Sequence, residues 1–348
     1  MISYCMKHIN YLLLYLFVSI HSCNILWGQE EGMSAPDSCI PVTDWSRIRI
    51  DTSRENFTSE SILIASNRKY TPEDASGTLL NNELSPNHQV HYFLASCADT
   101  LWKIAPVNSL TEGLDIINQG KNLVLFVHGN GKTFPASLDR TARIKNRYNT
   151  DIVLFDWPAE NFDLNISIEN ISQSSKNFQS LLKELKTYRL ERMDESQNLS
   201  LFMHSLGNLY LKKLVEDKAY EEDSVFIDNL ILNAAAIEEE NHQAVLSVLN
   251  FQKRIFVVCN QQDFILFGAQ FFLQKAMLGN GTNKPFGNAN YIDFTKVAGF
   301  EHTYFTGIHQ FEKDNHSVIS FYFNILNGLP LNEDDLIKEK TNTFLIPE

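Results

Sequence analysis

The sequence is poor in cysteine and has no block of basic residues. Its five cysteines are spread over 348 residues without a C-x-x-C pair, so the spacing that holds a structural zinc ion is missing. The formal net charge is −13 at pH 7. An acidic chain without a basic patch is a poor partner for nucleic acid or for an anionic membrane surface. We therefore expect no nucleic-acid partner.

Complete nucleotide-binding motifs are lacking too. The stretch "GNGKT" (129–133) is similar to a phosphate-binding P-loop, but the first glycine of that motif would fall on Phe126. A dinucleotide fingerprint fails as well, because its third glycine would fall on Phe134. Neither pattern supports nucleotide chemistry at this loop.

No apolar run is long enough to span a bilayer. The run "YLLLYLFVSI" (11–20) follows Lys7 and is short, as in a secretory signal peptide, which we predict over residues 1–22. The sequence "IHSC" ending at Cys23 is similar to a bacterial lipobox. Two outcomes stay open, lipidation at Cys23 or ordinary cleavage near Gly28, with an uncleaved anchor as a third. Each predicts an exported protein: periplasmic, an outer-membrane lipoprotein or extracellular. A lipid anchor would be its only membrane contact.

What the sequence does contain is an alternation of apolar runs and segments with helical periodicity. Continuous apolar runs are typical of parallel strands that are covered on both faces. We therefore predict an α/β fold with a doubly wound, mostly parallel sheet flanked by helices on both faces. The expected strands are 90–96, 122–128, 151–157, 199–204, 229–235, 254–260 and 290–295, and the expected helices are 136–147, 169–189, 206–217, 239–249, 264–277 and 315–327.

This alternation occupies only part of the chain. We expect an N-terminal extension over 23–88, the α/β domain over 89–328 and a polar tail over 329–348. Cys39 in the extension and Cys97 in the domain are a candidate disulfide pair in an oxidising compartment.

Ser205 follows the run 199–204 and directly precedes a helical segment. A serine at such a turn projects its hydroxyl above the carboxyl edge of the sheet, where a helix N-terminus favours developing negative charge. The alternative is an ordinary helix N-cap. Gly207 favours a nucleophile, because a tight elbow needs little bulk two positions after it. Met203 replaces the first glycine of the G-x-S-x-G elbow, so only half of the motif is present.

An acid and a histidine follow the serine in the chain order of a hydrolase sheet. Asp263 lies just beyond an apolar run, where it also suits a helix N-cap. His302 follows the last expected strand and is the first choice for the base. His316 is the runner-up and His309 a weaker rival. Asp156 also ends a strand, but it precedes the serine and is the weaker acid.

Stabilising an oxyanion requires backbone N–H groups beside the serine. The sequence "LFVHGNGKTF" ends a strand with two glycines within three residues, which lets the backbone turn sharply. The N–H of Asn130 could then act together with that of Leu206, the residue after the serine. The alternative is a plain glycine-rich turn.

Several short motifs occur in a fixed order, and the chain thereby resembles the α/β-hydrolase superfamily. It looks most like a bacterial alpha/beta-hydrolase group of uncharacterised function, over roughly residues 89–328. The resemblance implies Ser205 as nucleophile, Asp263 as orienting acid and His302 as general base, with Asn130 and Leu206 as oxyanion donors. The motifs are "HGNGKTF" (128–134), "DWP" (156–158), "HSLGN" (204–208) and "HTYF" (302–305).

The first hypothesis is therefore a serine hydrolase, similar to a carboxylesterase or lipase. It would act on a small-molecule or lipid acyl substrate through an acyl-enzyme, without a metal or organic cofactor. The alternatives are a non-catalytic cell-envelope binding or scaffold protein on a degenerate hydrolase fold, and an acyltransferase. The aromatic segment 264–277 is expected to be a buried helix, with an acyl-pocket lining as the alternative.

Overall fold

The computed structural model describes residues 41–42, 44–51, 53, 57–72, 78–98, 100–160, 163–219 and 224–348. The predicted signal peptide over 1–22, Cys23 and Cys39 lie outside these residues. Cys97 is disulfide-bonded, and Cys259 is a buried free thiol. Within the described ranges, no helix combines the length and the apolar character needed to cross a membrane.

Twelve strands of the described chain form one sheet, and a separate pair consists of β3 (Arg68–Tyr70) and β4 (Leu80–Leu84). Nearly all neighbours in the large sheet are parallel, and only β5 and β13 run against the rest. The predicted α/β fold with a mostly parallel sheet is confirmed. In spatial order the strands are β1 (Ile48–Ile50), β6 (Leu101–Val107), β5 (His91–Ala98), β2 (Ile62–Ser66), β8 (Asp151–Asp156), β7 (Leu123–Val127), β9 (Leu199–His204), β10 (Ile227–Asn233), β11 (Gln252–Cys259), β12 (Ala289–Asp293), β14 (Thr343–Leu345) and β13 (Ile337–Lys340).

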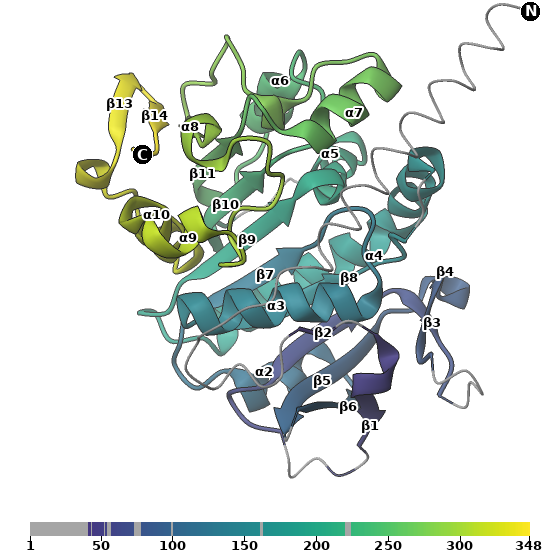
Figure 1. Ribbon diagram of the computed structural model, residues 1–348. Coiled ribbons are helices and arrows are strands. Elements are labelled where there is room, and N and C mark those ends of the chain that lie inside the picture. Colours follow the sequence, from purple (N-terminus) through teal and green to yellow (C-terminus); the bar gives the residue numbers. More distant parts are fainter. Residues whose placement is uncertain are drawn as a thin grey trace, which may run out of the picture. The chain divides into compact units, whose positions relative to one another are not determined.

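Helices cover both faces of the sheet. Two of them, α3 and α10, pack together in front of the sheet in Figure 1, whereas α2, α4 and α5 pack on the other face. The helices are α2 (Leu110–Ile117), α3 (Phe134–Tyr148), α4 (Leu164–Glu191), α5 (Leu209–Glu216), α6 (His242–Ser247), α7 (Phe264–Leu273), α8 (Thr295–Ala298), α9 (Gln310–Asp314) and α10 (His316–Leu326), and the 3₁₀ turn η5 spans Ser205–Asn208.

The winding of the sheet changes direction between β7 and β9. From β7 the chain passes through α3 to β8 on one side, and then returns through α4 to β9 on the other side of β7. Right-handed crossovers in opposite directions place α3 and α4 on opposite faces. The carboxyl ends of β7 and β9 are therefore the switch point at which sheets of this kind usually bind their ligands.

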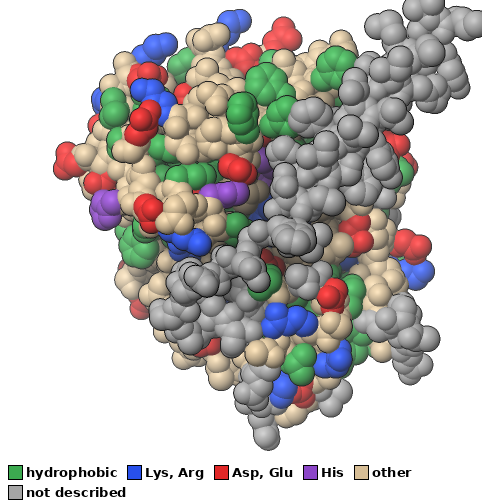
Figure 2. Space-filling model, viewed as in Figure 1, with side chains coloured by type: hydrophobic (Ala, Val, Ile, Leu, Met, Phe, Trp, Pro, Cys, Tyr) green, Lys and Arg blue, Asp and Glu red, His purple; other side chains and the backbone are tan. Residues whose placement is uncertain are grey.

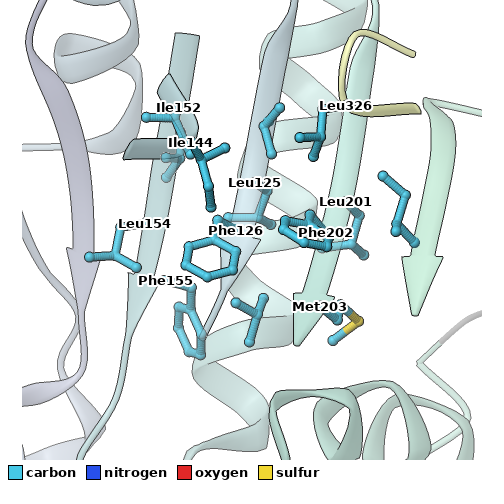
Figure 3. Packing of buried hydrophobic residues seen from close by; sticks show 14 of the residues in the cluster. Leu125, Phe126, Ile144, Ile152, Leu154, Phe155, Leu201, Phe202, Met203 and Leu326 are labelled. Atoms are coloured by element: carbon cyan, nitrogen blue, oxygen red, sulfur yellow. The ribbon is translucent and has the colours of Figure 1, made fainter. Parts of the chain in front are cut away.

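The core lies around these central strands (Figure 3). Every residue of β7, β8, β9 and β10 is buried. Phe126 of β7 stacks on Phe202 of β9 with ring centroids 5.4 Å apart, and Phe305 meets Phe202 edge-on at 4.8 Å. Met203, in place of a glycine, is fully buried in this core. Its bulk is therefore accommodated by the sheet below the turn at Ser205.

The sheet extends beyond the expected α/β domain at both ends. Strand β2 precedes residue 89 but lies between β5 and β8, where all its residues are buried. Strands β13 and β14 follow residue 328 and pair next to β12. The extension and the tail therefore contribute strands to the same sheet, because apolar runs as short as "ILIAS" suffice once neighbouring strands cover them.

Candidate active site

Ser205 stands at a strained turn at the carboxyl end of β9. Its backbone has φ +53°, in the left-handed region that a serine rarely adopts. The helix-cap alternative fails, because His204 and Asn208 occupy the N-cap positions of η5 and α5. A strained, non-capping serine between a strand and a helix is the geometry of a nucleophile elbow.

Two glycines let the backbone close around this turn. A Cβ on Gly207 would lie 2.6 Å from the carbonyl oxygen of His128 and 3.0 Å from that of Val127. A Cβ on Gly129 would lie 2.7 Å from the Cβ of Ser205. The loop after β7 therefore packs directly against Ser205. Gly207 contacts the end of β7, as expected for a small residue two positions after the serine.

His302 and Asp263 form a close pair beside the elbow. The Nδ1 of His302 donates to Oδ2 of Asp263 over 2.6 Å. Asp263 is fully buried, whereas the His302 side chain keeps 15% exposure. With the proton on Nδ1, the Nε2 of His302 is the free basic nitrogen. Asp263 also caps α7, since Oδ1 accepts from the N–H of Leu266 at 3.0 Å. One carboxylate thus caps the helix and contacts His302.

Asn260 fixes the loop that carries His302. Its fully buried amide donates from Nδ2 to the carbonyl oxygens of Gly299 and Glu301, at 2.8 Å and 2.9 Å. Sequence analysis did not single out Asn260. It follows β11 directly at the carboxyl edge of the sheet, so the strand-end rule that selected Asp263 could have found it.

The rival residues lie elsewhere. His316 is the first residue of α10, next to its Asn315 cap. His309 begins α9, and its Nε2 lies 3.4 Å from an oxygen of Glu301. Asp156 is engaged by other partners, described below. Among the sequence candidates for base and acid, only His302 and Asp263 are therefore brought together.

His204, immediately before the serine, packs against His302. Their ring centroids are 4.8 Å apart, and His204 is buried. Burial, together with the positive charge on neighbours such as His302, holds the pKa of His204 well below 6.5. The amide of Asn233 lies 3.3 Å from its Nδ1, and Tyr322 donates to the oxygen of the same amide over 2.6 Å. Asn233 must therefore donate to Nδ1, and the proton of neutral His204 lies on Nε2.

The loop after β7 is held in place on both sides. The backbone N–H groups of Gly131 and Lys132 donate to the carbonyl oxygen of Ala159 over 2.6 Å and 3.2 Å. Ser167 of α4 donates to the side-chain oxygen of Asn130 over 2.6 Å. Asn130 is thereby fixed on the loop that packs against Ser205. Its backbone N–H and that of Leu206 stay the predicted oxyanion donors.

A buried ion pair that the sequence did not reveal supports the same loop. Arg68 is fully buried, and its Nε lies 3.0 Å from Oδ2 of Asp156, which also accepts from Ser66 at 2.7 Å. Arg68 also donates to the carbonyl oxygen of Lys132 over 2.9 Å. Burial raises the pKa of Asp156, but the charge of Arg68 and the hydrogen bonds from His128 and Ser66 together lower it overall. The pair links β3 and β8 to the loop, and it occupies Asp156.

The aromatic helix α7 is not buried as expected. Leu266 is its only buried residue, while Phe267 and Phe271 are 47% and 61% exposed. The apolar periodicity does not distinguish a core helix from a surface helix whose apolar residues face outward. The exposed apolar side chains of α7 therefore follow directly after Asp263, which contacts His302. This exposure favours the alternative in which the segment lines an acyl pocket.

Comparison with known proteins agrees with this architecture. Residues 109–279 match the family described as "Alpha/beta hydrolase of unknown function (DUF900)". The matched segment contains the loop after β7, the Ser205 elbow and Asp263, and it ends before His302. No curated protein and no solved structure matches the chain. Over residues 109–279, the chain is therefore similar to an alpha/beta hydrolase family of unknown function, which agrees with the mostly parallel sheet described above.

Proposed function

We propose that the protein is a serine hydrolase that cleaves ester or related acyl bonds with Ser205, His302 and Asp263. The observation that carries this proposal is the His302–Asp263 hydrogen bond of 2.6 Å, formed beside a serine in a strained strand-to-helix turn. The match of residues 109–279 to an alpha/beta hydrolase family supports a hydrolytic reaction. The role of each residue follows from its position.

Acylation comes first. The Oγ of Ser205 attacks the ester carbonyl carbon while Nε2 of His302 takes the hydroxyl proton. The negative charge moves to the carbonyl oxygen, where the N–H groups of Asn130 and Leu206 stabilise it. Asp263 holds the ring orientation and stabilises the imidazolium. When the carbonyl re-forms, the bond to the alcohol breaks, and the alcohol leaves with the proton from His302.

Deacylation repeats the sequence with water. His302 takes a proton from a water molecule, whose oxygen attacks the acyl carbon of the Ser205 ester. Collapse of the second tetrahedral intermediate releases the carboxylic acid and returns the proton to Ser205. The net reaction consumes one water and yields one acid and one alcohol.

The test is steady-state hydrolysis of 4-nitrophenyl butyrate and longer 4-nitrophenyl esters. We expect Ser205→Ala to lower kcat about 10³-fold or more, because the nucleophile is removed. Ser317→Ala in α10 is the control and is expected to match the wild type. Equal activity of wild type and Ser205→Ala would contradict the proposal.

A further inference from the structure

Two positively charged side chains lie on the histidine side of the candidate site. Lys132 belongs to the loop that packs against Ser205, and Arg140 belongs to α3. Both charges act on the buried ring of His204, which packs against His302. The face of the molecule seen in Figure 2 carries histidine side chains with basic and acidic side chains nearby.

Lys132 is held in place through its backbone. Its N–H donates to Ala159, and its carbonyl oxygen accepts from the buried Arg68. Among the described residues its Nζ makes no hydrogen bond or ion pair, although the side chain is only partly exposed. These backbone contacts fix the position of the Lys132 Cα, and they thereby limit the region that its ammonium group can reach.

Arg140 is placed beside the catalytic base. Its Nη2 donates to Oγ1 of Thr303, the residue after His302, over 3.0 Å. Its guanidinium lies over the ring of Phe305, 5.7 Å from the centroid. No carboxylate in the described part of the chain forms an ion pair with it. A guanidinium has five N–H donors, so most of its capacity remains for a ligand.

The two cations also repel each other. The charge of Arg140, together with burial, lowers the pKa of Lys132 to about 7, and burial lowers the pKa of Arg140 to about 10. Asp139 opposes these shifts at both cations, and Glu312 opposes the shift at Arg140, but neither carboxylate forms an ion pair with them in the described part of the chain. The like charges of Lys132 and Arg140 therefore still disfavour the free site. A bound anion would relieve this repulsion and form charge-assisted hydrogen bonds with both groups.

We propose that Lys132 and Arg140 form a subsite for a negatively charged group, so that the preferred substrate is an ester carrying a carboxylate or a similar anion. This inference rests on the proposed function, which supplies the ester bond that is cleaved. It adds that the ester carries a negatively charged group. A neutral ester offers the two cations only uncharged acceptors, which form weaker hydrogen bonds with them than an anion does. The overall charge of −13 does not oppose this, since the cations act locally inside the site.

The test compares matched pairs of charged and neutral esters. Mono-(4-nitrophenyl) glutarate and 4-nitrophenyl valerate have acyl chains of equal length, and 4-acetoxybenzoate and 4-acetoxybenzamide place the charge on the leaving group. We expect the wild type to prefer the charged member of at least one pair. Lys132→Met and Arg140→Gln are expected to lower the charged-to-neutral ratio of kcat/KM by about 10- to 100-fold, because each removes one charge-assisted bond.

Conservative and remote variants guard against a folding defect. Arg140→Lys keeps the positive charge. Its charged-to-neutral ratio of kcat/KM is therefore expected to stay closer to the wild-type value than that of Arg140→Gln. Lys338→Met, in the edge strand β13, is expected to keep the wild-type ratio. Equal ratios in wild type, Lys132→Met and Arg140→Gln would overturn the subsite, as would preference of the wild type for the neutral esters. A loss that affects both members of a pair equally would also overturn it.

A second readout needs no turnover. Glutarate at fixed ionic strength is expected to raise the Tm of the wild type and of Ser205→Ala, but not that of Lys132→Met. If no ester is cleaved yet glutarate stabilises only proteins that retain Lys132, the anion subsite stands and the hydrolase proposal fails. Absence of any glutarate effect together with unchanged ratios would exclude the subsite.

Discussion

His302 and Asp263 are 39 residues apart, yet their side chains meet at 2.6 Å, and each side is fixed by a separate contact. The second oxygen of Asp263 is tied to the first turn of α7, and Asn260 holds the loop on both sides of residue 300. The imidazole is therefore oriented by the fold before any substrate binds. Such pre-organisation is what a general base requires.

Asp263→Asn separates the two roles of this residue. Asparagine caps helices about as well as aspartate, so the Tm is expected to stay near that of the wild type. The negative charge that orients and stabilises His302 is lost, so kcat is expected to fall about 10³- to 10⁴-fold. Measuring kcat and Tm on the same preparation decides the outcome.

Asp163→Asn is the matched control, because Asp163 caps α4 through its side chain without contacting a histidine. It is expected to leave kcat unchanged. If Asp263→Asn kept wild-type kcat, Asp263 would be a helix cap only.

The close approach at Gly207 makes this position intolerant of a side chain. The atoms that a Cβ would meet are backbone oxygens of β7 and of His128, which cannot move aside. We expect Gly207→Ala to lower the free energy of unfolding by about 1–3 kcal/mol, as for overpacking elsewhere. Urea denaturation measures this change.

Gly287→Ala is the comparison, since a Cβ there meets nothing within 4 Å. It is expected to be neutral or to stabilise by up to about 1 kcal/mol. Equal stability of the two alanine variants would refute the close packing of the elbow on β7.

Asn260 is predicted to be a positioning residue for His302. Asn260→Ala leaves two loop carbonyl groups without their donor, and we expect a destabilisation of about 1–3 kcal/mol. Because the loop shifts, kcat is expected to fall about 10- to 100-fold, with a smaller change in KM.

Asn342→Ala provides the control for stability alone. Asn342 also donates to two carbonyl oxygens, those of Phe286 and Ala289 at 2.8 Å and 2.6 Å, but at the start of β12 and thus at the opposite end of the sheet. The Asn342→Ala substitution is expected to destabilise the protein with little loss of kcat. A parallel loss of kcat in both variants would mean that Asn260 acts through stability only.

The buried, neutral His204 makes folding sensitive to acid. Its pKa in the folded protein lies well below 6.5, so below pH 6.5 the unfolded chain binds a proton that the native state does not. Stability is therefore lost as the pH falls through this window. Between pH 7.5 and 5.5 we expect the wild type to lose about 1 kcal/mol more unfolding free energy than His204→Gln. Parallel pH profiles of the two proteins would argue against a neutral, buried His204.

The sequence predicted the central strands well because both of their faces are buried. Each expected strand is present, as the continuous apolar runs of β7 and β9 illustrate. The strands that were not predicted have weaker signals. β2 is a run of five residues within a polar region, and β6 contains Lys103 and Pro106, so neither has a clear periodicity. Burial by neighbouring strands, which local sequence does not encode, determines these elements.

At the site, residues that follow a strand could be predicted, and residues that act across elements could not. Asp263 and His302 were identified because the carboxyl ends of parallel strands share one edge. Arg68 gave no signal, since its partner Asp156 lies 88 residues further along the chain. The outward-facing apolar side of α7 was also missed, because composition alone suggested a core helix.

Covalent labelling of Ser205 is the most direct test of the central claim. The wild type would be treated with a fluorophosphonate, digested and mapped by mass spectrometry. A catalytic Ser205 activated by His302 is expected to carry the phosphonyl group, Ser205→Ala and His302→Ala are expected to remain unlabelled, and Ser317→Ala is expected to label like the wild type. A wild-type protein that stays unlabelled, or a label on another serine, would contradict the account.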